Sequence, residues 1–201
     1  MTLLTAQELA ALSIKIDGGD SGRLQTEVRR VRHFDTEKLI HAAPERRDDR
    51  GTAQFDEVAA CTARILSLLT DFGFDKPRLW DAARMIAPPA SGVHRGRDEQ
   101  GNWIETPYWE DANLEARHIK NLPDALMRGE DWPLRLYWTK QFGRTAISGG
   151  FVLPSDRPDL EAERAGENFR KHHEIQRTGE LVIPVANLCA SIVEHYRDAS
   201  K

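Results

Sequence analysis

The apolar residues between positions 58 and 72 recur every three or four residues, and this spacing constrains the fold more than any other feature of the sequence. Such spacing places them on one face of an α-helix, which must be buried against other elements. Gly73 follows directly and can end the helix in a left-handed conformation. The stripe consists of Val58, Cys61, Ile65, Leu68, Leu69 and Phe72. The sequence therefore predicts a long amphipathic helix here.

Further helix signals flank this stripe on both sides. Thr5 and Glu8 have the spacing of a capping box, in which the two side chains satisfy backbone amides at a helix start. The turn-forming residues 17–22 must end this first helix. Apolar residues at positions 24, 28 and 31 predict a second helix, and Asp75 can cap a fourth one. The first 86 residues are therefore expected to be mainly helical.

A proline pair, Pro88-Pro89, breaks the helical pattern and divides the sequence. We expect residues 1–88 to be an independently folded domain, 89–102 to be a linker and 103–201 to be a second module that serves dimerisation or the binding of a partner or effector. The expected fold class is α+β, with a mainly helical first domain and a small α+β module.

Within the second module, the pattern predicts helices at 113–127 and 185–196. Strands are predicted at 134–138, 146–153 and 181–183. Residues 155–180 are densely charged and fit either a solvated helix or a disordered loop.

Composition and motifs exclude several classes of protein. The 201 residues carry a formal net charge of −4 and are 40% hydrophobic, as is typical of a globular chain with its own core. No apolar run reaches the roughly 20 residues that span a membrane, and the N-terminus lacks the pattern of a secretory signal. We therefore expect a cytoplasmic protein that does not enter a membrane.

No motif in the sequence indicates catalysis or metal binding. It contains no phosphate-binding glycine loop, nucleophile elbow, zinc signature or dinucleotide fingerprint. Cys61 and Cys189 have no metal-ligand spacing and are expected to be buried, reduced core residues. The adjacent His172 and His173 would point in different directions on a charged helix and are expected to be solvated. We predict that the protein is not an enzyme and has no cofactor and no metal site.

Three segments of the first half share residues with a known family. Residues 31–40 follow the pattern Ile-Arg-Tyr-Tyr-Glu-x-x-Gly-Leu-Leu, residues 51–55 stand where Gly-Tyr-Arg-x-Tyr is expected, and residues 72–75 match Leu-Gly-Phe-Ser. In this order the segments resemble the DNA-binding domain of MerR-type regulators, whose first helix matches the Leu9-Ala10 pair. The resemblance covers residues 3–86 and implies a winged helix-turn-helix domain that binds duplex DNA.

The sequence departs from the family pattern in three ways. It has more residues between Leu9 and Arg32 than the tight turn of the family allows, and Ala53 stands where an arginine is usual in the wing. Pro88 and Pro89 end the helix that would continue as a dimerising coiled coil. The resemblance therefore implies DNA binding, but neither effector sensing nor promoter untwisting.

In a winged helix-turn-helix, the second helix enters the major groove and the wing contacts the flanking backbone. Here these elements would be the helix at about 21–35 and the loop at about 41–54. Arginine pairs with guanine edges and with phosphates. Because Val31 must face the first helix, Arg32 and His33 are expected at the surface, with Val31 and Phe34 in the core. The candidate DNA-binding residues are Arg29, Arg30, Arg32, His33, Arg46, Arg47 and Arg50.

The sequence thus predicts a sequence-specific transcriptional regulator that binds double-stranded DNA. We expect a homodimer, because two half-sites give more base contacts than one. RNA polymerase or another regulator is a further candidate partner.

Several alternatives stay open. The arginines of the second helix and the loop could be ordinary solvated residues. The protein could also be a phage-type adaptor, similar to an excisionase or a small terminase subunit, whose winged helix serves assembly with protein. The aromatic residues of the second half could line an effector pocket or anchor a core or interface. These are Trp103, Tyr108, Trp109, Trp132, Tyr137 and Trp138.

Overall fold

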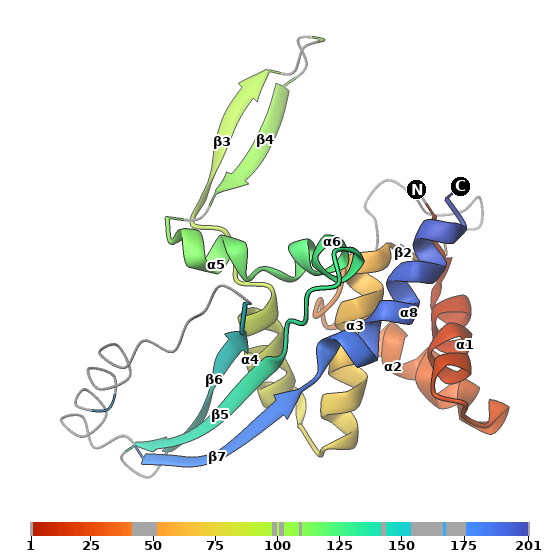
Figure 1. Cartoon of the computed structure of the whole chain (residues 1–201), viewed down its shortest axis with the longest axis horizontal. Helices are drawn as coiled ribbons and strands as arrows, with labels where there is room; N and C mark the ends of the chain where they lie inside the picture. The colour runs from red at the N-terminus through yellow and green to blue at the C-terminus, as the bar shows by residue number, and fades with distance from the viewer. Residues whose placement is uncertain are drawn as a thin grey trace.

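The computed structural model describes residues 2–41, 52–97, 100, 103–108, 110–141, 144–153, 167 and 176–200. Its central element is helix α3 (Glu57–Asp71), which is contacted by elements from both halves of the chain (Figure 1). The Asp56 carboxylate caps α3 by accepting a 2.8 Å hydrogen bond from the amide of Ala59.

The predicted stripe of α3 is buried for most of its length. Cys61, Ile65 and Leu69 are fully buried, and Val58 and Leu68 are half-buried. Phe72, expected on the same face, is instead 57% exposed, because α3 ends at Asp71 and the chain turns away at Gly73, which has a φ of 82°.

The first half of the chain supplies a short strand pair and three more helices. Its elements in chain order are β1 (Leu4–Thr5), α1 (Ala6–Ile16), the 3₁₀ turn η1 (Ser21–Arg23), α2 (Leu24–Thr36), β2 (Gln54–Phe55), α3 and α4 (Lys76–Ile86). Strands β1 and β2 are antiparallel, with Leu4 opposite Phe55. The capping box at Thr5 and Glu8 and the cap at Asp75 are present as predicted.

The second half forms a projecting hairpin, a run of short helices and a three-stranded sheet. Strands β3 (Gly92–Arg97) and β4 (Trp103–Tyr108) pair antiparallel and extend away from the rest of the molecule (Figure 1). The remaining elements are α5 (Ala112–Ala116), η2 (Ile119–Asn121), α6 (Leu122–Met127), β5 (Leu134–Gln141), β6 (Arg144–Phe151), β7 (Gln176–Ile183) and α8 (Val185–Asp198). The sheet has the order β6-β5-β7 and is antiparallel throughout.

Two sequence predictions for this half need correction. Residues 92–97, expected to be part of a linker, form strand β3. The single helix expected at 113–127 is divided into α5, η2 and α6, because His118 has an extended backbone and caps η2. Most of the charged segment 155–180 lies outside the described residues, and its last part, from Gln176, is in β7.

The C-terminal helix completes the core of the first half. Helix α8 packs against α3 and α6, while β6 packs against α4. The α8 residues Cys189, Ile192 and Val193 are almost fully buried, so this helix belongs to the core. One continuous cluster of buried residues includes side chains from both halves. The ends of the chain also meet, since the hydroxyls of Thr2 and Ser200 lie 2.9 Å apart (Figure 1).

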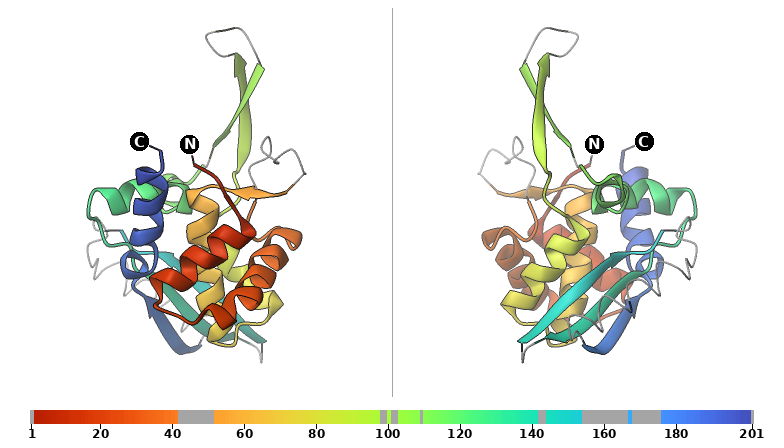
Figure 2. Two further views of the ribbon diagram at one scale, coloured as in Figure 1. Left: turned by 90° about the vertical axis from the view of Figure 1, so that its right-hand side faces the viewer. Right: turned by 90° about the vertical axis from the view of Figure 1, so that its left-hand side faces the viewer.

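The observed class is α+β, as expected from the sequence. Figure 2 shows α1 and α2 on one side of the molecule and the three-stranded sheet on the other. Among the described residues, no helix has the length and apolar character needed to span a membrane.

Candidate nucleic-acid interface and an adjoining pocket

Helix α2 has a buried face and a polar face, in the orientation that the sequence predicted. Val31 and Phe34 are 4% and 1% exposed, and they join the core beside α1 and α3. Arg32 and His33 are exposed, as is Arg29 one turn before them. The predicted division of these positions between core and surface is therefore confirmed.

The exposed residues of α2 carry basic, amide or hydroxyl side chains, and none of them is an acid. These residues are Gln25, Thr26, Arg29, Arg32, His33 and Thr36. Among the residues that the structure describes, neither Arg29 nor Arg32 forms an ion pair. The side chains available on this surface are thus those that donate to phosphates and to base edges.

Two acids near this surface have partners within the protein, and a third, Asp35, is half-buried near the end of α2. Glu27 is 6% exposed and lies between Arg30 and Ser67, with distances of 3.0 and 3.3 Å to its carboxylate oxygens. Glu37, just after α2, pairs with Lys76 at 2.6 Å. The hydrogen bond from Lys76 lowers the pKa of Glu37, so this carboxylate is charged and compensated. The basic character of the α2 surface is therefore not cancelled by these acids.

Arg30 differs from its neighbours among the candidate DNA-binding residues. Its guanidinium donates to Glu27 at 3.0 Å and to Asp71 at 2.6 Å, and its side chain is only 22% exposed. These contacts connect α2 to the end of α3. Arg30 is placed to hold the helix in position rather than to reach outward.

The connection between α1 and α2 is fixed by α3. It comprises residues 17–23, including the turn η1, and is longer than the turn of a compact helix-turn-helix. Arg64 of α3 forms an ion pair with Asp17 at the start of this connection. The extra residues that the sequence shows between Leu9 and Arg32 thus include an enlarged turn that is bonded to α3. Arg46, Arg47 and Arg50, predicted for the wing, lie outside the described residues.

The residue that follows the C-cap of α2, Lys38, has an unusual backbone conformation. Lys38 has a φ of 56° and is the one non-glycine residue with positive φ in the described part of the chain. Its amide donates to Asp35 and the amide of Leu39 donates to Phe34, at 2.9 and 2.8 Å. This is the Schellman arrangement, in which glycine is usual. The left-handed conformation costs a residue with a side chain roughly 1–2 kcal/mol.

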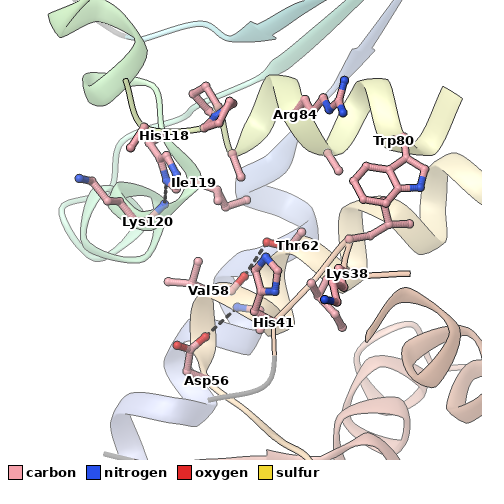
Figure 3. Close-up of a pocket in the computed structure, with 18 residues that line it drawn as sticks. Lys38, His41, Asp56, Val58, Thr62, Trp80, Arg84, His118, Ile119 and Lys120 are labelled. Atoms are coloured by element: carbon pink, nitrogen blue, oxygen red, sulfur yellow. Dashed lines mark hydrogen bonds between the residues drawn. The ribbon is translucent and has the colours of Figure 1, made fainter. Parts of the chain in front are cut away.

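A pocket of about 760 Å³ opens beside this helix end. It lies between the segment 38–41, the start of α3, the second half of α4 with the following prolines, and η2. Figure 3 shows His118 and Lys120 on one side of it and Lys38 and Trp80 on the other. Apolar groups form much of the wall, contributed by Ile40, Val58, Ala59, Trp80, Ala83, Ala87, Pro88, Pro89 and Ile119.

The polar groups of the pocket are mainly basic. Lys38, His41, Arg84, His118 and Lys120 line it, and Asp56 is the one acid among its described lining residues. Asp56 is already engaged in capping α3. The side chain of Lys120 pairs with Glu115 at 3.1 Å, while Arg84 lies 5.7 Å from the ring centroid of Trp80. Lys38 and Arg84 form no ion pair within the described part of the chain.

His118 lines the pocket in its neutral form. Burial lowers its pKa, and the charge of Lys120 lowers it further. Its Nδ1 accepts a 3.0 Å hydrogen bond from the amide of Lys120, so in the neutral ring the proton is on Nε2.

Sequence reasoning did not find this pocket, because its lining comes from four separated segments that no single pattern connects. Two of the aromatic residues that had been considered for a pocket serve the core instead. Trp132 is 4% exposed beside Phe151, and Trp138 packs edge-on against Phe74 at 5.7 Å. The indole that lines the pocket belongs to Trp80, which is not among the aromatic residues that the sequence suggested for this role.

Among the described residues, no group of three or more His, Cys, Asp or Glu side chains is placed to hold a metal ion. Neither a comparison with models of protein families nor a comparison with curated proteins finds a match to this chain.

Proposed function

We propose that the protein binds duplex DNA through the exposed face of α2 and acts as a transcriptional regulator. The observation that carries the proposal is the absence of acids from this face, together with the outward position of Arg29 and Arg32. Gln25 and Thr26 precede them on the same exposed side. Arginine and glutamine are the residues that read guanine and adenine in the major groove.

The order of the elements supports this proposal. The chain runs β1, α1, α2, a connecting segment, β2, α3 and α4, and β1 pairs with β2. A winged helix-turn-helix of the MerR type would have this order, with α2 as recognition helix and the segment between α2 and β2 as wing. In this proposal Arg46, Arg47 and Arg50 of that segment contact the backbone of the DNA.

We propose further that a dimer places two α2 helices on adjacent half-sites. Helix α8, rich in apolar residues, is buried within its own chain and is not available for this contact. The hairpin β3–β4 projects from the rest of the described chain (Figure 1), and it is the candidate for the dimer contact. Sedimentation of the protein with and without residues 92–108 tests this assignment.

The DNA proposal is tested by titration. Fragments bound by the purified protein are selected from genomic DNA, and the affinity of Arg29→Ala and Arg32→Ala for one selected fragment is measured at several salt concentrations. A lost phosphate contact should lower the salt slope of log affinity by about 1, and a lost base contact should cost roughly 1–3 kcal/mol.

Arg135→Ala is the matched control, because Arg135 is exposed on β5, on the other side of the molecule (Figure 2). It removes the same charge and should leave affinity and slope almost unchanged. Wild-type affinity and slope in both α2 variants would overturn the proposal and favour the adaptor function, in which this surface contacts protein.

A further inference from the structure

We infer that the pocket beside Lys38 is a binding site for a small organic anion with a flat apolar body, such as an aromatic carboxylate. The volume of about 760 Å³ lies in the range of small-molecule sites, roughly 300–1,000 Å³. An apolar wall with a few convergent polar groups is the usual composition of such a site.

The sign of the charge in the pocket selects the ligand. Among its described lining residues the cationic groups outnumber the acids, and the acid present, Asp56, already accepts the hydrogen bond that caps α3. Lys38 and Arg84 stand on different elements and are not paired with a described acid, so each is available to the carboxylate of a ligand. The indole of Trp80 and the prolines after α4 offer flat apolar surface for the ligand body.

The backbone at Lys38 provides an independent argument. Three other helices of the described chain, α1, α3 and α6, end in the same hydrogen-bond pattern with a glycine at the left-handed position: Gly18, Gly73 and Gly129. Helix α2 alone among these four has a side chain there, despite the conformational cost. Strain that persists beside a cavity points to a role for the side chain that causes it. The presence of a lysine at this left-handed position is explained if its side chain binds a ligand.

A single substitution at Lys38 should change stability and ligand binding in opposite directions. Replacing Lys38 by glycine relieves the backbone, so Lys38→Gly should melt roughly 2–4 °C higher than the wild type. The same change removes one cation from the pocket and should weaken the binding of an anion about tenfold, as expected for the loss of a charge-assisted contact. A purely structural lysine would not show these opposite effects.

The probe is 1-naphthaleneacetate, titrated calorimetrically into the full chain without DNA, with 1-naphthaleneacetamide as its uncharged counterpart. The acetate should bind the wild type more tightly than the amide does. Lys38→Gly and Arg84→Gln should each weaken the acetate and leave the amide nearly unchanged. Ala83→Trp, which fills the pocket from α4, should weaken both ligands.

Arg78→Gln is the matched control, because Arg78 is an exposed arginine of the same helix that does not line the pocket. It should bind both ligands as the wild type does. Absence of acetate binding at millimolar concentration, equal affinity for acetate and amide, or unchanged binding in Lys38→Gly and Arg84→Gln would each overturn the inference. Since no DNA is present, these outcomes are independent of the function proposed for α2.

Discussion

The Tyr196 hydroxyl donates a 3.0 Å hydrogen bond to the carbonyl oxygen of Phe55, so the C-terminal helix α8 is bonded to strand β2 across 141 positions of sequence. Both residues are buried. Burial also raises the pKa of Tyr196, which keeps the phenol protonated as a donor. Strand β2 follows the segment proposed as the wing, and α8 therefore supports the element on which that segment ends.

Tyr196→Phe should lower the free energy of unfolding by about 1 kcal/mol, because it removes this hydrogen bond and leaves a buried carbonyl without its partner. Urea unfolding followed by circular dichroism measures the change. Tyr137→Phe is the control, since Tyr137 is only half-buried on the sheet. If both variants unfold at the same urea concentration, the hydrogen bond of Tyr196 does not contribute to the free energy of unfolding as expected.

A fragment ending at Ala87 should fail to fold on its own. The sequence suggested an independent domain, but in the structure Cys189 and Ile192 of α8 cover α3, and β6 covers α4. Removing them would expose apolar surface on both helices, at roughly 25 cal/mol for each Å². We expect no cooperative thermal transition for residues 1–87. A sharp transition in that fragment would restore the independent domain.

Local signals in the sequence predicted most of the first half. The capping box at Thr5 and Glu8, the stop at Gly73 and the cap at Asp75 act within a few residues, so their effect can be derived without the tertiary fold. The outward position of Arg32 followed from helical geometry once Val31 was assigned to the core. Glu27 lies four residues before Val31 and so falls on the buried side of the helix, but its partners Arg30 and Ser67 could not be derived from the spacing.

The second half was harder to predict from the sequence, because its elements depend on contacts between residues that are far apart in the chain. The side chains of β3 in the projecting hairpin are mostly exposed, so this strand lacks the alternation of apolar and polar residues that marks a half-buried strand. The polar composition suggested a linker instead. The pocket combines Lys38, Asp56, Arg84 and His118 from separate elements, and their proximity arises only when α4 and η2 pack beside α3.

Gly149→Ala should destabilise the sheet strongly, by roughly 2–4 kcal/mol. Gly149 has a φ of 151° on β6, and a Cβ added there would overlap the backbone carbonyl of Arg135 on β5. The neighbouring Gly150→Ala is the matched control, because its nearest atom, the Met85 carbonyl oxygen, would be 4.0 Å from the new Cβ. Thermal unfolding distinguishes the two. Similar melting temperatures would show that β5 and β6 can separate at little cost.

The neutral His118 should make the protein less stable in mild acid. Burial lowers its pKa below the ordinary value of 6.5, and the nearby Lys120 lowers it further, whereas Glu115 opposes this shift. The unfolded chain therefore takes up the proton first. The contribution of His118 is complete above pH 6.5 and is lost as the pH falls from there through the folded pKa.

His118→Asn isolates this effect, because asparagine can still cap η2 with its side-chain oxygen but does not titrate. The free energy of unfolding, measured in urea between pH 7.5 and about 5, should fall less steeply for this variant than for the wild type. His195→Asn, at an exposed position of α8, should keep the wild-type slope. If His118→Asn and the wild type lose stability in parallel, then the fold does not oppose the protonation of His118, and the imidazole at the pocket is not held neutral.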